Sequence, residues 1–288
     1  MNEQELGLVI VLFNPSMEDT SFLLHLSSLY NGIIIDNTVS DGKRTEKQIG
    51  KMKYIKLCNN YGIACAQNIA YNIIFKDDRI KYIISFDQDS RFNDDYPQEI
   101  VAKYKQIKSK EPKLGILGPL IVNKTTKEIY KSAIHKDIYY LPNFIVKPEI
   151  ISSGSCFDKT LLSLVGYNDE SLFIDYVDTE WCFRAISKGF ICGVTTDLLL
   201  EHKVGRKELH IGRHLISISA PGRYYYQYRN YIILFFRNYV PFWFKRNIGI
   251  KFLLRYIYLP FFIDKGFKTW CNMNKGIMAG VKYLIHKK

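Results

Sequence analysis

Short apolar runs, each ending at polar or turn residues, recur along the first 120 residues of the chain. Five of them are typical of strands: LGLVIVLF (6–13), GIIIDN (32–37), KYIKL (53–57), YIISFD (82–87) and LGILGPLI (114–121). Strands that are apolar throughout belong to sheets covered on both faces. Helix-compatible segments at 17–30, 64–76 and 96–110 alternate with them, which predicts an α/β fold with a mostly parallel sheet.

Polar residues come at or just after the ends of four of the predicted strands: Asn14, Asp36, Asn59-Asn60 and Asp87. In open α/β sheets, ligands bind in the crevice outside the carboxyl ends of the strands. We therefore expect these residues to lie along one edge of the sheet. The chain has no GxGxxG after the first strand and no GxxxxGK[ST], so neither a dinucleotide fingerprint nor a P-loop explains this edge.

The stretch SFDQDS (85–90) carries two carboxylates to the end of a buried strand. Residues i and i+2 of an extended chain point to the same side, so Asp87 and Asp89 can converge on one cation. Mg²⁺ and Mn²⁺ prefer oxygen ligands and often share them with substrate phosphates, so the pair predicts a metal that holds a diphosphate. An EF-hand loop would need Gly where the chain has Phe92. A DxD phosphohydrolase is the remaining alternative.

A second acidic cluster, Asp175, Asp178 and Glu180, precedes a helix-like stretch that Gly189 closes. These residues are suited to capping a helix, since Asp178 can be the N-cap and Glu180 favours the positive end of the helix. A carboxylate at a helix start beside a cleft can equally act as a general base. The two roles are compatible.

Charge and aromatic content change near residue 223. The last 66 residues hold thirteen Lys and Arg and one acid, Asp264, and so account for the whole net charge of +12. We expect a catalytic domain at 1–222 and a basic, aromatic helical extension at 223–288. Contact with a membrane surface is favoured over packing alone, and nucleic acid is not expected as a partner. Two apolar stripes are predicted there: Tyr224, Tyr228, Tyr231, Phe235 and Tyr239, then Ile250, Leu253, Leu254, Ile257 and Phe261.

The six cysteines form no CxxC pair and do not cluster with the histidines, which predicts reduced thiols in a cytosol. His202 follows another apolar run, and on spacing alone a lone histidine is more often a packed or surface residue than a metal ligand.

Together these stretches resemble the inverting, nucleotide-sugar-dependent glycosyltransferases of family two, which have the GT-A fold. Within that family they are most similar to bacterial rhamnosyltransferases of polysaccharide and O-antigen assembly. The matching pieces follow the family's order: VIVLFNP (9–15), IIIDNTVSD (33–41), NNYGIACAQNIA (59–70), SFDQDS (85–90), SSGSCF (152–157), FIDYVDTEWCFRAISKGF (173–190), LEHKVG (200–205) and YYYQYRNYIILFFRNY (224–239).

The resemblance implies a role for each matching position. The Phe13-Asn14 turn and Asp36 would bind the nucleotide base and ribose. The same pocket would be lined by Asn60, Gly62, Gln67 and Asn68. One departure is Leu12-Phe13, which stands where Thr-Tyr is usual.

The resemblance also implies the metal ligands and the base. Asp87 and Asp89 would bind the sugar and a Mg²⁺ or Mn²⁺ ion, with Asp89 as direct ligand and His202 as a further candidate. Asp178 falls where the family has its catalytic base. Val177 replaces an acid that often precedes that base, so Asp175, Asp178 and Glu180 all stay open for the role.

The predicted function is a metal-dependent inverting glycosyltransferase that moves L-rhamnose from dTDP-L-rhamnose to a lipid-linked saccharide. We expect it in the cytoplasm, peripheral at the inner face of the plasma membrane. The alternative is transfer of galactofuranose, a hexose or an N-acetylhexosamine on the same fold. A phosphohydrolase and a catalytically inactive, membrane-associated scaffold are the rivals from other classes. The sequence leaves the acceptor and the oligomeric state open.

Overall fold

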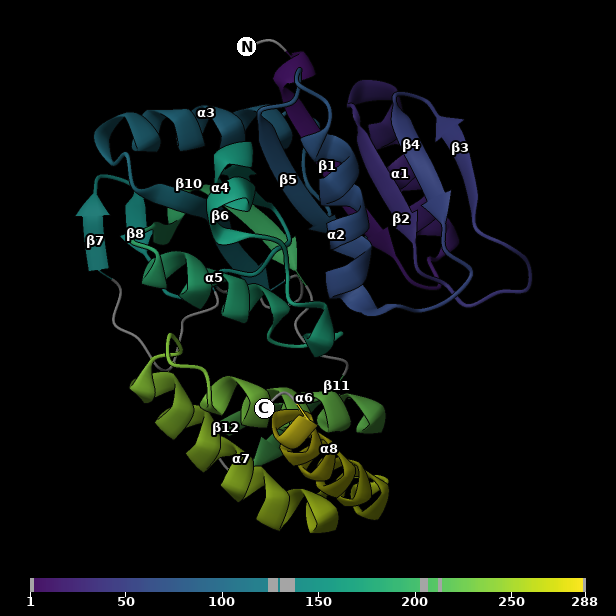
Figure 1. Cartoon of the computed structure of the whole chain (residues 1–288), viewed down its shortest axis with the longest axis vertical. Helices are drawn as coiled ribbons and strands as arrows, with labels where there is room; N and C mark the ends of the chain where they lie inside the picture. Colours follow the sequence, from purple (N-terminus) through teal and green to yellow (C-terminus); the bar gives the residue numbers. More distant parts are fainter. Residues whose placement is uncertain (1–2, 124–128, 130–137, 203–206, 212–213, 287–288) are drawn as a thin grey trace. The chain divides into compact units, whose positions relative to one another are not determined.

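The computed structural model of the chain divides into two compact units (Figure 1). It describes residues 3–123, 129, 138–202, 207–211 and 214–286. The first unit comprises Met1–Phe173 and Val177–His202, and the second comprises Ile174–Tyr176 and Lys203–Lys288. The second unit therefore contains, besides the predicted helical extension, a hairpin that precedes it and three residues from the middle of the chain.

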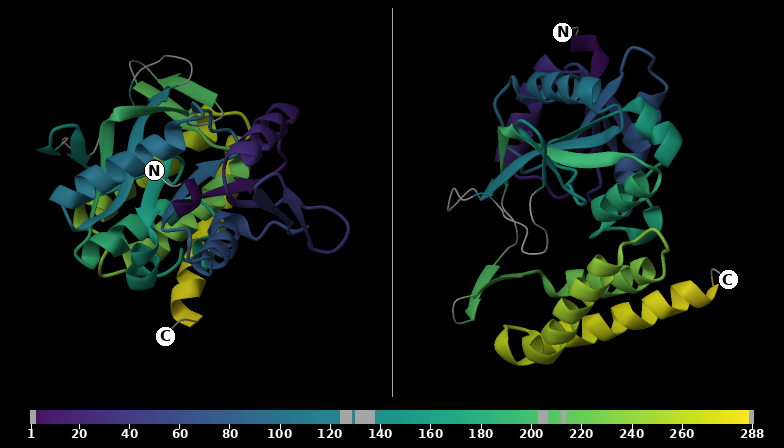
Figure 2. Two further views of the ribbon diagram at one scale, coloured as in Figure 1. Left: turned by 90° about the horizontal axis from the view of Figure 1, so that it is seen from above. Right: turned by 90° about the vertical axis from the view of Figure 1, so that its left-hand side faces the viewer.

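A ten-stranded sheet runs through the first unit, with helices on both of its faces (Figures 1 and 2). From one edge to the other, its strands are β3 (Thr45–Ile49), β4 (Met52–Lys56), β2 (Gly32–Asp36), β1 (Leu6–Leu12), β5 (Tyr82–Asp87), β9 (Ser155–Asp158), β6 (Leu114–Asn123), β10 (Ile191–His202), β8 (Phe144–Val146) and β7 (Ile138–Leu141). The helices are α1 (Met17–Leu29), α2 (Gly62–Phe75), α3 (Tyr96–Lys110), α4 (Lys159–Val165) and α5 (Val177–Ser187), with short 3-10 turns η1 (Glu3–Glu5) and η2 (Glu170–Leu172).

The α/β class is confirmed, and the sheet is mixed. Strands β4, β2, β1 and β5 are parallel neighbours, as the alternation of strands and helices predicts. Beyond them, β9 lies between β5 and β6 and is antiparallel to both. Parallel neighbours need a long crossover, usually a helix, whereas antiparallel strands do not. The described residues between β6 and β9 contain two short strands and no helix, so β9 returns in the opposite direction.

The core explains why the central strands are apolar throughout. In β1, Val9 and Val11 face a hydrophobic cluster that includes α2, α4 and α5, whereas Leu8 and Ile10 face a second cluster with α1 and α3. Successive side chains of a strand point to opposite faces, so a sheet covered on both sides needs apolar residues at every position. All seven residues of β1 are buried. Polar groups therefore come to the surface where the strands end.

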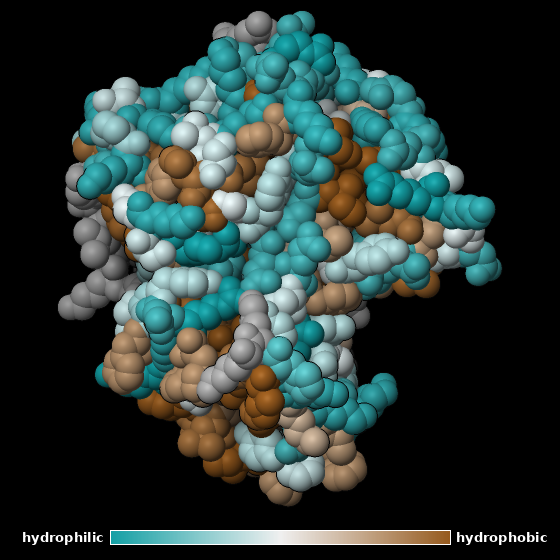
Figure 3. Space-filling view, viewed as in Figure 1, coloured by the Kyte–Doolittle hydropathy of each residue, from teal (hydrophilic) through white to brown (hydrophobic). Residues whose placement is uncertain are grey.

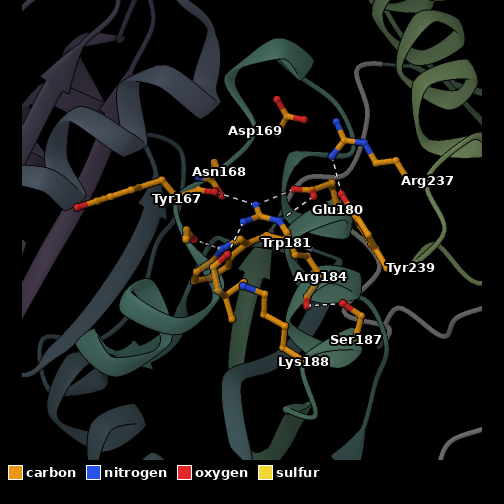
Figure 4. A network of polar contacts seen from close by, with 12 residues as sticks. Tyr167, Asn168, Asp169, Glu180, Trp181, Arg184, Ser187, Lys188, Arg237 and Tyr239 are labelled. Atoms are coloured by element: carbon orange, nitrogen blue, oxygen red, sulfur yellow. Dashed lines mark hydrogen bonds and ion pairs between the residues drawn. The ribbon is translucent and has the colours of Figure 1, made fainter. Parts of the chain in front are cut away.

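Helix α5 contains a buried ion pair, and the arginine of this pair also bonds to the chain before the helix (Figure 4). The guanidinium of Arg184 donates to both carboxylate oxygens of Glu180, at 2.9 Å each, and Glu180 is fully buried. Arg184 also donates to two backbone carbonyls of the loop 165–167, at 2.7 Å each, and the indole of Trp181 donates to a third at 2.8 Å. These bonds hold the middle of α5 against the chain at 165–167, while the first turn of the helix carries Asp178.

Three helices make up most of the second unit: α6 (Pro221–Phe235), α7 (Phe242–Phe262) and α8 (Gly266–His286), preceded by the hairpin strands β11 (Lys207–Ile211) and β12 (His214–Ile218). Helix α8 packs closely on α6. A Cβ on Gly276 would lie 2.3 Å from the carbonyl oxygen of Tyr225, so only glycine permits this approach. Within the described parts of the chain, none of the helices combines the length and the apolar content that a membrane span requires.

The first aromatic stripe of the second unit is shorter than predicted. Its first four residues lie in α6, but the helix ends at Phe235, and Tyr239 follows in the connection to α7. Proline disfavours helical backbone in the residue before it, and Pro241 directly precedes α7. One helix cannot therefore run through both segments.

The variant Glu180→Ala should lower the free energy of unfolding by about 3–5 kcal/mol, because it leaves a largely buried guanidinium without its counter-charge. The side chain of Arg184 is 18% exposed. The exposed pair of Arg44 with Glu46 provides the matched control, since Arg44→Ala should cost less than about 1 kcal/mol. Urea denaturation followed by circular dichroism measures both changes, and equal losses would contradict a structural role for Glu180.

Candidate active site

The carboxyl ends of four neighbouring strands meet at one edge of the sheet. The register pairs Leu12 of β1 with Asp36 of β2, and Asp36 with Lys56 of β4. On the other side of β1, Val11 pairs with Asp87 of β5. The strand ends whose following polar residues were predicted to share an edge are therefore brought together.

Backbone N–H groups after β1 donate to side chains from the neighbouring strand ends. The N–H of Phe13 donates to Oε1 of Gln88 at 2.7 Å, and the N–H of Asn14 donates to Oγ1 of Thr38 at 2.8 Å. Asn14 has a φ of 51°, in the left-handed region that Asn tolerates better than most residues. Phe13 is 45% exposed, so its ring is open to solvent beside this edge.

Asp36 is buried at the end of β2, and both of its carboxylate oxygens are held. Oδ1 accepts the N–H of Thr38 at 3.0 Å, and Oδ2 accepts the hydroxyl of Tyr54 at 2.5 Å. Burial, and then the bond to Asp36, raises the pKa of Tyr54, so the hydroxyl keeps its proton and donates it. Carboxylate oxygens can accept more than one hydrogen bond, which leaves capacity for the predicted contact with a nucleotide.

Asn37, which sequence reasoning missed as a site residue, organises the loop before α2. Its Nδ2 donates to Oδ1 of Asn60 at 3.0 Å and to the carbonyl of Gly62 at 3.2 Å, and its Oδ1 accepts the N–H of Tyr61 at 2.9 Å. The Oδ1 of Asn60 also accepts the N–H of Gly62. Asn37 directly follows Asp36 in the sequence, so its place beside a predicted site residue could have identified it.

Gly62 has two reasons to be glycine. Its φ is 85°, and a Cβ there would lie 2.5 Å from the carbonyl oxygen of Phe173. That carbonyl accepts the N–H of Ile63 at 2.8 Å, so it satisfies a backbone donor that the start of α2 leaves open. Gly62, a predicted nucleotide-binding position, therefore also lies where the start of α2 is bonded to Phe173, the residue that follows η2.

Two further predicted pocket residues are directed at the loop before η2. Gln67 accepts a hydrogen bond from Nδ2 of Asn168 at 2.8 Å and donates to Ser152 at 3.1 Å. Asn68 donates to the carbonyl of Asn168 at 3.0 Å and to Glu170 at 2.9 Å. Both amides are buried and shape this loop, and their predicted contact with a nucleotide stays a prediction.

The turn that carries Asp87 and Asp89 is fastened by residues that sequence reasoning did not single out. The buried hydroxyls of Ser90 and Ser153 are 2.5 Å apart. The guanidinium of Arg91 donates to the backbone carbonyls of Gln88 and Ser90, at 3.0 Å each. Ser153 lies in SSGSCF (152–157), one of the stretches that match the family, and that match could have identified it.

Arg91 is itself held by α1. It donates to Oδ1 of Asp19 at 2.7 Å, and its guanidinium lies 4.9 Å from the ring centroid of Phe22. Burial raises the pKa of Asp19, but hydrogen bonds from Arg91 and Ser16 outweigh it, and the net pKa lies below the usual value. The ionised pair connects the acidic turn to the first helix.

The donor atoms at this turn fit a divalent cation that also binds substrate oxygens. Asp87 is half-buried and Asp89 is exposed. The described residues contain no group of three or more His, Cys, Asp or Glu that could hold a metal. The acids of this turn are Asp87 and Asp89. Mg²⁺ typically takes one or two carboxylates together with water and phosphate oxygens. His202 ends β10, and its side chain lies outside the described residues.

The three candidate bases have different surroundings. Glu180 is fully buried and paired with Arg184. Asp175 belongs to the second unit, where Arg223 donates to both of its carboxylate oxygens, at 2.5 and 3.2 Å. Asp178 is half-buried in the first turn of α5.

Asp178 lines a small cavity of the first unit, with Tyr71, Ser152 and Asn168 among the other walls. Its volume of about 10 Å³ leaves room for about one water molecule. A much larger cavity, about 400 Å³, is lined by residues such as Lys51 that precede the strands, so it lies at their amino ends. The candidate site is therefore identified by its side chains and not by the size of its cavity.

Curated proteins of similar sequence are glycosyltransferases. The chain is 32% identical over 244 residues to the dTDP-rhamnosyl transferase RfbF of Shigella flexneri. The aligned region covers 81% of this chain and 80% of that protein. The chain is 20% identical over 193 residues to the low-salt glycan biosynthesis hexosyltransferase Agl10 of Haloferax volcanii, covering 63% and 61%. No protein-family model matches the chain.

Solved structures of S. aureus TarS share the fold. One TarS structure gives a TM-score of 0.55 at 13% identity and covers 90% of this chain, which spans 46% of that longer chain. TarS 1-349 in complex with UDP-GlcNAc gives 0.54 at 13% identity, covering 96% and 81%. Identities this low show the fold alone, whereas the 32% identity over most of the chain shows the family. The chain belongs to the nucleotide-sugar-dependent GT-A glycosyltransferases of family two, close to the bacterial rhamnosyltransferases.

Proposed function

We propose that this glycosyltransferase is metal-dependent and inverting, and that it transfers L-rhamnose from dTDP-L-rhamnose to a lipid-linked saccharide in cell-surface polysaccharide assembly. The observation that carries the proposal is the turn with Asp87 and Asp89, which leaves the sheet at the same edge as Asp36. A nucleoside bound beside Asp36 would extend its diphosphate along this edge toward the two carboxylates.

The two curated relatives favour different sugar donors. The relative at 32% identity is a dTDP-rhamnosyl transferase, and this supports dTDP-L-rhamnose. The similarity to the archaeal hexosyltransferase favours a second candidate, in which another hexose, galactofuranose or an N-acetylhexosamine is transferred on the same fold. Direct comparison of these donors decides between them.

In the proposed reaction, one displacement exchanges the diphosphate for the acceptor. The carboxylate of Asp178 accepts the proton of an acceptor hydroxyl. The hydroxyl oxygen bonds to the anomeric carbon as the bond from that carbon to the diphosphate oxygen breaks, and attack from the opposite face inverts the configuration. A Mg²⁺ or Mn²⁺ ion held by Asp87 and Asp89 would supply positive charge for the departing diphosphate.

Asp178 is the favoured base because it falls where the resemblance puts the family's base and because it lines a small cavity of the first unit. Glu180 would have to give up its buried pair with Arg184 to take a proton, and Asp175 would have to give up Arg223. Asp178 lies at the start of α5, where the positive end of a helix stabilises a charged carboxylate. That position suits a group that must be ionised to accept a proton.

Contact with a membrane is supported by the outer face of α7. The second predicted stripe lies in this helix, and its five residues are 54–83% exposed. The opposite face is buried, and there Phe252 stacks on Tyr228 of α6 with ring centroids 4.5 Å apart. Figure 3 shows hydrophobic side chains at the surface of the second unit. An apolar face that is not needed for packing within its own unit is suited to the interfacial region of a bilayer.

A row of basic residues adds charge to this surface. Lys268, Lys275 and Lys282 are exposed and recur every seven residues along α8, so they share one side of the helix. The exposed Phe267 and Met278 lie beside them. We therefore propose that the second unit binds anionic lipid at the inner face of the plasma membrane, where a lipid-linked acceptor would be found.

The variant Asp89→Ala should lower transfer of rhamnose from dTDP-L-rhamnose by at least about 100-fold, since it removes a ligand of the cation that neutralises the leaving group. EDTA should have the same effect on the native enzyme, and Mn²⁺ should restore activity. Release of dTDP with an acceptor present measures both.

Asp95→Ala is the control for this measurement, because Asp95 is a nearby exposed acid that makes no side-chain capping bond. Full activity in EDTA would exclude the metal. Phosphate release without an acceptor would favour a phosphohydrolase, and failure to bind any nucleotide sugar would favour an inactive scaffold.

The variant Asp178→Asn should lower kcat by about 10²- to 10⁴-fold with the KM for the donor little changed, because the amide cannot accept the proton. Steady-state kinetics on the purified variant measure the loss. Glu180→Gln, which keeps the shape of the buried side chain, should retain most of the turnover. A larger loss in Glu180→Gln than in Asp178→Asn would assign the base to Glu180.

Replacing Ile257 and Phe261 together by Glu should weaken binding to vesicles that contain phosphatidylglycerol by at least about tenfold, because two apolar anchors become charged. Binding should also fall in high salt and with neutral phosphatidylcholine vesicles. Flotation assays measure it. Leu164→Glu is the control, since Leu164 is a similarly exposed apolar residue on α4. Equal vesicle binding of the native protein and all variants would contradict the proposed membrane contact.

A further inference from the structure

Three residues with a Cβ adopt positive φ within four positions of the chain, directly before α5. Phe173, Asp175 and Tyr176 have φ values of 64–65°. Residues other than Gly rarely adopt this conformation, which persists only where the surroundings enforce it. The segment 174–176 is followed at once by Val177, the first residue of α5, and then by Asp178. The conformation of this segment therefore sets how the chain enters α5.

Asn230 of α6 holds the backbone of this segment. Its Nδ2 donates to the carbonyl of Ile174 at 2.8 Å and to the carbonyl of Asp175 at 2.9 Å. A side-chain amide nitrogen has two hydrogens, but successive carbonyls of an extended strand point in opposite directions. One amide can serve both carbonyls here because the left-handed turn brings them to the same side.

The amide of Asn230 is itself fixed. Asn230 is 0% exposed, and its Oδ1 accepts a hydrogen bond from Nε of Arg229 at 2.9 Å. This bond selects the orientation in which Nδ2 faces the two carbonyls. A buried amide is costly unless its groups are paired, so the arrangement specifies one backbone conformation for segment 174–176.

The side chains of the segment are held by the same unit. Arg223 of α6 forms two hydrogen bonds with the carboxylate of Asp175. The ring of Tyr176 packs edge-on against Phe244 of α7, with centroids 5.7 Å apart. Backbone, carboxylate and ring are thus all fastened to α6 and α7.

We propose that Asn230 and Arg223 are positioning residues for glycosyl transfer. They hold segment 174–176 in its left-handed conformation and so fix the point from which α5 presents Asp178 to the acceptor hydroxyl. This inference rests on the proposed role of Asp178 as the base. The helical extension then contributes to the chemistry through the backbone of three residues.

The variants Asn230→Ala and Arg223→Ala test the inference. Each should lower kcat roughly 10- to 100-fold, the effect of a small misplacement of a catalytic group, with little change in the KM for dTDP-L-rhamnose or in dTDP affinity. Arg223→Lys should recover part of the loss, because it keeps the charge but not the two-pronged geometry. Arg223 is 49% exposed, so its truncation leaves no buried void if Asn230→Ala folds poorly.

Tyr228→Phe is the matched control. Tyr228 is a buried residue of α6 whose hydroxyl donates to the carbonyl of Phe252 at 2.7 Å, so the variant also loses one hydrogen bond to a backbone carbonyl in the second unit. The bond that the substitution removes is to α7 and not to segment 174–176, so the kcat of Tyr228→Phe should stay at the native value. A comparable loss of kcat in Tyr228→Phe would show that loss of any such hydrogen bond in the second unit lowers kcat. It would overturn the inference.

A double-mutant cycle separates positioning from structure. In an Asp178→Asn background, measured by single turnover with enzyme in excess, Asn230→Ala and Arg223→Ala should cause no further loss, because the group they position is already gone. A merely structural role would lower the rate by the same factor in both backgrounds and would overturn the inference. Native turnover in Asp178→Asn would overturn the proposed base as well. Loss of turnover in Asp178→Asn with native rates in both α6 variants would sink the positioning role alone.

Discussion

Burial of the central strands on both faces is the constraint on which the rest of this structure depends. A carboxylate inside such a sheet would have to be paired or neutralised, because moving an unpaired charge out of water is very costly. Charged groups can therefore appear only where a strand leaves the core. Asp36 and Asp87 are the last residues of β2 and β5, and the parallel register brings these two ends to one edge. The location of the candidate site is a consequence of how the core is covered.

The edge itself is shaped by side chains that bond across long stretches of sequence. Gln88 accepts the N–H of Phe13, Arg91 reaches Asp19 of α1, and Ser90 meets Ser153. These bonds fix the backbone of the acidic turn and of the turn after β1. Each partner is polar and close to the site, yet its observed bonds are within the protein. Polar residues near a ligand site often serve to hold its backbone, and their presence alone does not make them ligands.

The second unit connects two parts of the proposed function. One side of α7 packs inward, where Phe252 and Phe244 lie against Tyr228 and Tyr176. The other side exposes the apolar stripe that would enter a lipid surface. The proposed membrane contact and the proposed control of the segment before Asp178 therefore meet in one helix. Its sequence is apolar on both sides, and the inward side packs within the second unit.

The sequence by itself determined the alternation of strands and helices, the edge at which Asp36 and Asp87 appear, and the change to a basic, aromatic composition near residue 223. Those features follow from local hydrophobic periodicity and from charge, which neighbouring residues in the chain suffice to specify. The tertiary structure alone decided that β9 is inserted antiparallel, that the pair of Glu180 with Arg184 is buried, and that Asn230 and Arg223 hold the segment before α5. Asp175, Asp178 and Glu180 lie within six residues and are chemically alike, and the local signal that separates them is Arg184, four positions after Glu180 in the same helix. The partner of Asp175, Arg223, comes from a distant helix, and a carboxylate's role depends on the cation or helix end that lies beside it in space.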